Sequence, residues 1–137
     1  MEYVGGPWWE LQLLDGWLVT EHPECLTLTR SAHGAFQLSS AVKTQGTILP
    51  SEVEAQARKG TPETARSMPF EAGEFFGFTS GCEEGDTHWQ RFWLAHRNIL
   101  VFATYNGSPA AWRSEQPAVL AMLATLRLRA PANALPA

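Results

Sequence analysis

The segment Gly81–Asp86, with the sequence GCEEGD, holds the densest group of chemically active side chains in the chain. A thiol at Cys82 beside the carboxylates of Glu83, Glu84 and Asp86 has the ligand types of a metal site. An activated cysteine, however, needs cationic neighbours that stabilise its thiolate, and these carboxylates supply the opposite charge. We therefore interpret the segment as a solvated acidic loop.

The other candidate groups do not form a catalytic or metal-binding motif. The chain has four histidines, which are His22, His33, His88 and His96. No H-x-x-x-H or C-x-x-C spacing occurs, so a dedicated zinc site is not expected. No G-x-S-x-G elbow and no glycine-rich phosphate loop is present. The sequence thus predicts no catalytic, cofactor-binding or metal-binding residue, although carboxylate pairs that assemble across a fold stay open.

Tryptophan is unusually frequent, with six copies in 137 residues. Four of them have strand contexts and are expected to pack in the core: Trp9, Trp17, Trp89 and Trp93. Trp112 follows a turn signal and is expected in a surface loop. Because tryptophan is enriched at interface hot spots, Trp112 joins Glu83, Glu84 and Asp86 as the predicted partner-binding patch. The alternative is a solvated loop beside a tryptophan that folds back on the sheet.

Composition favours one cytosolic domain. The formal charge is −4 with scattered Lys and Arg, so neither nucleic acid nor an anionic membrane is an expected partner. No apolar run approaches the roughly 20 residues of a membrane span, and the amino terminus does not resemble a signal peptide. We expect a single domain over residues 1–137, with an ordered core at about 8–129 and a fraying tail at 130–137.

The first third of the chain predicts antiparallel strands. Trp8–Leu14 alternates apolar and polar side chains, as a half-buried strand does. Asp15-Gly16 is a strong signal for a type I′ hairpin turn, after which Trp17–Thr20 would return beside the first strand. Two further alternating segments, Cys25–Arg30 and Ala35–Lys43, predict two more strands.

The middle of the chain predicts a short helix and a connection. Ser51 and Glu54 have the spacing of a capping box, and the helix should end near Gly60. The segment Thr61–Gly73 has two prolines and reads as a meandering connection. A further strand is predicted at Glu74–Thr79.

The last third predicts a central hairpin and a covering helix. Trp89–Ala95 and Ile99–Tyr105 are rich in aromatic and branched side chains, with a turn at His96–Asn98. Ser114 is the expected N-cap of the helix, with Glu115 near the positive end of its dipole. The helix carries one apolar stripe, made of Val119, Leu120, Met122, Leu123 and Leu126.

Three stretches carry a resemblance to a known family. They are the DGW turn at Asp15–Trp17, the GAFQLSS strand at Gly34–Ser40, and the central hairpin with its terminal helix. Together they resemble the PsbP/Mog-type α/β/α sandwich and small uncharacterised bacterial proteins like it. The resemblance implies an α+β fold, in which a mainly antiparallel sheet packs against a short helix and a long C-terminal helix. Proteins of that group mostly bind other proteins, and no catalytic motif carries over.

These observations favour a non-catalytic cytosolic domain that binds another protein. A bacterial immunity protein or a secretion-effector chaperone would fit the size, the acidity and the lack of motifs. The alternative is a small-ligand-binding protein or small enzyme with a pocket between the sheet and the helix.

Overall fold

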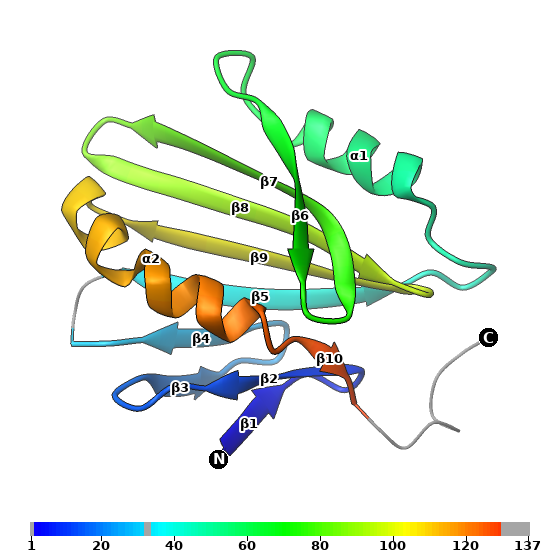
Figure 1. Ribbon diagram of the computed structural model, residues 1–137, viewed down its shortest axis with the longest axis horizontal. Coiled ribbons are helices and arrows are strands. Elements are labelled where there is room, and N and C mark those ends of the chain that lie inside the picture. Colours follow the sequence, from blue (N-terminus) through cyan, green and yellow to red (C-terminus); the bar gives the residue numbers. More distant parts are fainter. Residues whose placement is uncertain (1, 32–33, 130–137) are drawn as a thin grey trace.

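Seven antiparallel strands form the large sheet, in the order β3-β4-β5-β9-β8-β7-β6 (Figure 1). The computed structural model describes residues 2–31 and 34–129 of the chain. The strands of this sheet are β3 (Leu18–Glu21), β4 (Leu26–Thr29), β5 (Ala35–Val42), β6 (Ser67–Ala72), β7 (Phe75–Glu84), β8 (Thr87–His96) and β9 (Ile99–Gly107). With α1 (Pro50–Lys59) and α2 (Pro109–Leu123), they confirm the predicted α+β class.

A smaller sheet joins the beginning and the end of the described chain. Its order is β1 (Glu2–Gly5), β2 (Trp9–Leu13) and β10 (Arg127–Leu128). Figure 1 shows it beside the end of the large sheet that β3 and β4 form. β1 lies before residue 8, where the predicted ordered core begins. The predicted tail at 130–137 lies outside the described residues.

The predicted hairpin around Asp15-Gly16 is wrong, although the turn itself exists. Trp17 donates its backbone N–H to the Leu14 carbonyl oxygen at 3.2 Å, and Gly16 has a φ of +88°. The two flanking strands nevertheless belong to different sheets. β2 has β1 on one edge and β10 on the other, so β3 pairs with β4 instead.

The central hairpin is confirmed as β8 and β9, with Trp89 opposite Asn106 and Trp93 opposite Phe102. Its turn is Arg97-Asn98, and the left-handed backbone lies at Arg97, with a φ of +56°, rather than at Asn98. Asn98 is buried and donates its side-chain N–H to the carbonyl oxygen of Lys43 at 3.3 Å.

The segment between α1 and the hairpin contains more strand than predicted. The predicted connection Thr61–Gly73 contains β6, and its Pro69 is tolerated because β6 is an edge strand. β7 extends to Glu84, so Gly81–Asp86 is a strand end followed by a tight turn rather than a loop.

The first helix begins two residues earlier than the predicted capping box requires, with its N-cap at Leu49 instead of Ser51. Pro50 occupies the first helical position, where its fixed φ suits a helix start, and Leu49 is therefore the N-cap. Glu52 accepts the Leu49 backbone N–H at 2.8 Å, whereas Ser51 and Glu54 make no such box. The predicted end at Gly60 is confirmed.

The second helix begins earlier than predicted, at Pro109 instead of after Ser114. The hydroxyl oxygen of Ser108 accepts the backbone N–H of Ala111 at 3.0 Å, so Ser108 is the N-cap. The helix has 15 residues. Trp112 and Glu115 therefore lie inside the helix rather than in the preceding loop and first turn.

The two helices pack on opposite faces of the large sheet. α2 lies across β9 and β5 in Figure 1 and covers the main core. The smaller cluster on the other face is made of Val53, Ala57, Phe78 and Trp93, which join α1 to β7 and β8.

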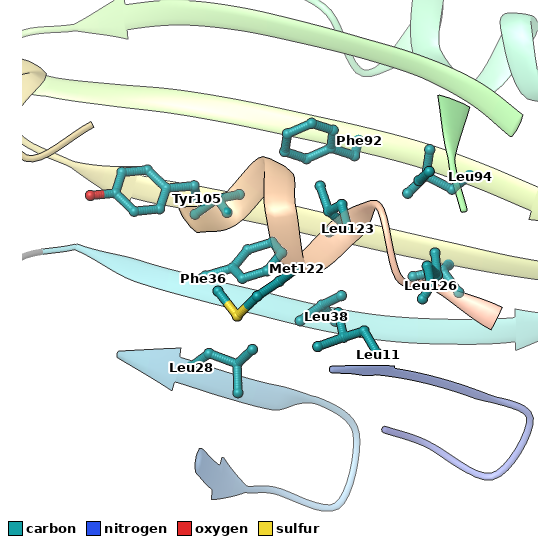
Figure 2. Close-up of a cluster of buried hydrophobic side chains, with 14 of the residues drawn as sticks. Leu11, Leu28, Phe36, Leu38, Phe92, Leu94, Tyr105, Met122, Leu123 and Leu126 are labelled. Atoms are coloured by element: carbon teal, nitrogen blue, oxygen red, sulfur yellow. The ribbon is translucent and has the colours of Figure 1, made fainter. Parts of the chain in front are cut away.

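The main core fills the space between the sheet and α2. Figure 2 shows this cluster, whose labelled residues are Leu11, Leu28, Phe36, Leu38, Phe92, Leu94, Tyr105, Met122, Leu123 and Leu126. All of them are buried. Within α2, Val119, Met122 and Leu123 of the predicted apolar stripe are buried and Leu120 is half-buried, which confirms the helix as the cover of the hairpin. Leu126 is also buried, but it lies beyond the helix, which ends at Leu123 rather than at Leu126 as predicted.

Replacing Leu123 by Ala should lower the free energy of unfolding by about 2–5 kcal/mol, as large-to-small changes in cores do. Leu123 is 0% exposed. The matched control is Leu18→Ala, where the same side chain is 67% exposed and the change should stay within about 0.5 kcal/mol. Urea unfolding of the three proteins measures both differences. Equal losses at the two sites would show that α2 does not anchor the core.

Candidate functional site

The sheet divides the predicted acidic patch between its two faces. Glu83 lies opposite His88 and Glu84 opposite Thr87 in the β7–β8 ladder. Because successive side chains of a strand point to opposite faces, Glu83 shares the α2 face with His88. Glu84 shares the other face with Arg91, whose guanidinium nitrogen lies 3.9 Å from its carboxylate. Asp86 is exposed in the turn that follows.

Trp112 is mostly buried, so the predicted exposure of this side chain is wrong. It is 9% exposed, and its ring stacks on the His88 ring with 5.2 Å between centroids. It also packs against Tyr105 at 4.9 Å. The early start of α2 explains this placement, because Trp112 then lies on the same helical face as Val119, seven residues further on. Trp112 and Glu84 thus belong to different faces of the sheet.

One part of the sheet face on which α1 packs is polar. Within residues 2–31 and 34–129, neither α1 nor α2 covers it. Arg91 lies opposite Thr104, which lies opposite Gln37, which in turn lies opposite Thr27. These four residues form one row across the sheet, and each is half-buried. We call this row, together with the half-buried Trp89, the open face.

Arg91 organises the aromatic end of the open face. Its guanidinium carbon lies 5.0 Å from the centroid of the Trp89 ring, within range of a cation–π interaction. Arg91 also points to Glu84 at 3.9 Å and to the sulfur of Cys82 at 3.7 Å. This group combines a broad apolar ring with a fixed positive charge and an exposed carboxylate.

A buried carboxylate on α2 forms the other polar cluster. Glu115 is 0% exposed. One of its oxygens accepts the Tyr105 hydroxyl at 2.6 Å and the Gly34 backbone N–H at 3.0 Å. The other oxygen lies 3.5 Å from the Arg30 guanidinium.

Sequence reasoning missed this network, because Glu115 was assigned to the first turn of the helix. The spacing carried a usable signal: with the helix begun at Pro109, Glu115 lies three residues after Trp112 and four before Val119. Those intervals place it on the buried face of the helix.

The buried network joins α2 to β9 and to the residues that flank β4 and β5. Burial, the hydrogen bond to Glu115 and the Glu115 charge raise the pKa of Tyr105 above its usual value. The phenol therefore stays protonated at neutral pH and acts as a hydrogen-bond donor. None of the three clefts described below is lined by Tyr105, Glu115 or Arg30.

Three surface clefts of the described residues lie away from the space between the sheet and α2. One of about 560 Å³ lies between the Gly5–Trp9 segment, the β3–β4 turn and the end of β5. Two others are lined mainly by residues 12–17 and 61–67.

No group of three or more His, Cys, Asp or Glu side chains that could hold a metal ion occurs among the described residues. Neither α1 nor α2, the helices of this part of the chain, is long and apolar enough to cross a membrane.

Comparison with known proteins gives a likeness of fold. No protein-family profile and no curated protein matches the chain. An uncharacterised protein of Bacteroides thetaiotaomicron VPI-5482 is similar, with a TM-score of 0.69 and 15% identity over 90% of this chain. The chain spans about half of that protein, covering 46% of its length.

A second similar structure carries the resemblance drawn from the sequence. Cyanobacterial PsbP (CyanoP) from Synechocystis sp. PCC 6803 has a TM-score of 0.56 and 9% identity. The match covers 88% of this chain and 86% of CyanoP. The predicted likeness to PsbP and to small bacterial proteins is therefore confirmed for the fold.

Replacing Tyr105 by Phe should lower the free energy of unfolding by about 1.5–3 kcal/mol, because a hydrogen bond to a buried carboxylate is lost. The contribution of the Tyr105 hydroxyl to the free energy of unfolding should also depend on pH. The raised pKa keeps the folded phenol protonated where the unfolded phenol ionises, near pH 10. The contribution is complete below that pH and is lost as the pH rises above it.

Denaturant unfolding at pH 7 and at several pH values above 10 measures this difference. The parent protein should lose stability more steeply than the Tyr105→Phe variant over the alkaline range. Parallel alkaline curves for the two proteins would contradict the assignment.

Proposed function

We propose that this protein is a non-catalytic domain that binds another protein through the open face of its large sheet. A bacterial immunity protein or a secretion-effector chaperone, acting in the cytoplasm, is the kind of protein that we have in mind. The observation that carries the proposal is the group of Trp89, Arg91 and Glu84 on a part of the sheet that neither helix covers.

The side chains of the open face are of the types that dominate protein interfaces. Tryptophan and arginine are enriched among interface hot spots. Arg91 lies 5.0 Å from the Trp89 ring centroid and is also oriented by Glu84, so it would lose little further freedom on binding. The row of Thr27, Gln37 and Thr104 beside it offers hydroxyl and amide groups for hydrogen bonds.

The acidic residues support the choice of a basic partner. Glu84 and Asp86 are exposed at the tip of the β7–β8 hairpin, and Glu83 lies beside them on the other face. Exposed charges at the edge of an interface act mainly by steering the encounter between two proteins. Trp112 lies on α2 and stacks on His88 on the opposite face of the sheet, so it is not part of this surface, and its replacement should lower the stability of the protein rather than weaken binding directly.

The test begins with capture of a partner by the full chain from its host, followed by binding kinetics with the purified partner. Trp89→Ala should speed dissociation at least about tenfold, the effect of losing a hot-spot side chain. Changing Glu83, Glu84 and Asp86 together to Lys should slow association and reverse its dependence on salt.

The matched control changes two other exposed glutamates and one exposed aspartate to Lys, at Glu63, Glu71 and Asp15. This variant has the same net charge as the first, but its changes lie away from the β7–β8 tip. It should associate more nearly as the parent does. If Trp89→Ala and the Glu83, Glu84, Asp86 variant both fold and bind as the parent does, the open face is not the binding surface.

A further inference from the structure

The strand β5 is paired along its whole length on one side only. Residues 35–42 lie opposite β9, whereas β4 pairs only with residues 35–38. Figure 1 shows β5 continuing past the end of β4. Within the described chain, no other strand pairs with residues 39–42 on that side. We call these four residues the free edge of β5.

The β5–β9 pairing shows which backbone groups point to the free edge. In an antiparallel ladder, pairs of residues that exchange hydrogen bonds alternate with pairs that do not. Lys43 donates its backbone N–H to the Asn98 carbonyl oxygen at 2.8 Å, in the same register as the β5–β9 ladder. The odd-numbered residues of β5 therefore bond to β9. The N–H and C=O groups of Ser40 and Val42 point to the opposite side.

The β3–β4 hairpin gives the same result independently. His22 donates its backbone N–H to the Cys25 carbonyl oxygen at 2.9 Å, in register with the β3–β4 ladder. The odd-numbered residues of β4 thus bond to β3, and the even-numbered ones bond to β5. Because the β4–β5 ladder ends at Leu38, the next groups of β5 that face this side are those of Ser40 and Val42. In residues 2–31 and 34–129, no turn or loop backbone bonds to them.

The free edge of β5 faces the cleft of about 560 Å³. Residues 38–42 form one wall of this cleft, and the Gly5–Trp9 segment and the β3–β4 turn form the others. The volume is within the range of ligand sites, about 300–1,000 Å³. Unpaired N–H and C=O groups along a strand are a template for another strand. The cleft therefore offers the donors and acceptors that an extended backbone needs.

The other walls of the cleft favour particular side chains. In an added strand, residues opposite Ser40 and Val42 would point to the α2 face. The half-buried Trp8 and Val42 pack there at the margin of the main core, so apolar side chains suit these positions. Glu21 and Glu24 are exposed on the β3–β4 turn and make no ion pair with the described residues. They would pair with a basic side chain of the added strand.

We propose that this cleft binds an extended segment of a partner protein, in which apolar and basic residues alternate. The segment adds to the large sheet as a short strand beside the free edge of β5. Both strands that already pair with β5 are antiparallel to it, and the added strand takes the same direction. Backbone hydrogen bonds supply affinity in this mode of recognition, and alternate side chains supply specificity.

The cleft is distinct from the open face. Trp89 lies opposite Asn106, which lies opposite Ala35 at the start of β5. The free edge is at the other end of that strand. Binding at one surface can therefore be lost while binding at the other is kept, and this proposal does not depend on the open face.

The experiment measures amide hydrogen exchange of the full-length protein by NMR. The probe is a five-residue peptide with blocked termini, in which valine at both ends and in the centre alternates with lysine. Without peptide, the amides of Ser40 and Val42 should exchange faster than those of Ser39 and Ala41, which face β9. Saturating peptide should slow exchange at Ser40 and Val42 at least about tenfold, as new hydrogen bonds do. Exchange at Ser39 and Ala41 should stay unchanged.

Two methylated peptides test whether the backbone is recognised. In the proposed register, the N–H of the central valine donates to β5, and the lysine N–H groups point away. Methylation of the central valine nitrogen should therefore abolish binding. Methylation of one lysine backbone nitrogen is the matched control and should leave binding in place, because the two peptides have the same composition and charge.

Variants of the protein test the two kinds of wall. Ser40→Pro removes an N–H that serves no ladder, a position where strands tolerate proline, and should weaken peptide binding at least about tenfold. Ser40→Ala keeps that N–H and should bind as the parent does. Glu21→Gln with Glu24→Gln should weaken binding, most clearly at low salt. Glu63→Gln with Glu71→Gln, also exposed, is the matched control and should bind as the parent does.

The proposal is overturned if the peptide does not slow exchange at Ser40 and Val42, or if it protects another strand edge instead. Equal binding of the unmodified peptide and of the form methylated at the central valine would also overturn it. Equal binding by the parent and the Glu21, Glu24 variant would overturn the choice of a basic segment. If Ser40→Pro does not fold, the two methylated peptides decide the question.

Discussion

The burial of the Glu115 carboxylate constrains the whole arrangement of helix and sheet. A charge removed from water is costly unless hydrogen bonds and opposite charge replace the solvent. Here the replacements come from Tyr105 on β9, from Gly34 just before β5, and from Arg30 just after β4. The three groups are brought together by pairing of those strands, so the helix can settle only on a correctly assembled sheet.

This requirement also fixes which side of α2 faces inwards. With Glu115 directed at the Tyr105 hydroxyl, Trp112 lies over His88 and Tyr105. One and two helical turns after Glu115, Val119 and Met122 pack in the main core. A rotation of the helix would leave the carboxylate without its donors and would expose its apolar side chains. Polar and apolar contacts thus select the same orientation.

Much of the fold could be predicted from the sequence, because it depends on local patterns. The β8–β9 hairpin, the end of α1 at Gly60 and the apolar stripe of α2 follow from turn residues and periodicity. The pairing of β2 could not be predicted in this way, since its partners β1 and β10 are chosen by the tertiary structure. Both helix starts were misplaced because proline at the first helical position outweighed the nearby Ser51 and Ser114.

The candidate sites were harder to predict than the fold. Glu83 and Glu84 are neighbours in sequence, but strand alternation separates their side chains, and a loop interpretation hid this. The open face depends on the register of four strands. The cleft beside Trp9 is assembled from three segments that lie far apart in the sequence.

The short strand β10 pairs with residues that are far from it in the sequence. Leu128 pairs with Trp9, so the ladder of the smaller sheet joins residues from opposite ends of the described chain. Contacts of such high sequence separation form late, because a long loop must first be closed. During synthesis on the ribosome, β2 would wait for its second partner until nearly all of these residues had emerged. Arg129, which holds the Gly6 and Trp8 carbonyls, arrives at the same time. The wall beside Trp9 would therefore be among the last parts of a nascent molecule to take shape, and a truncated chain would lack it.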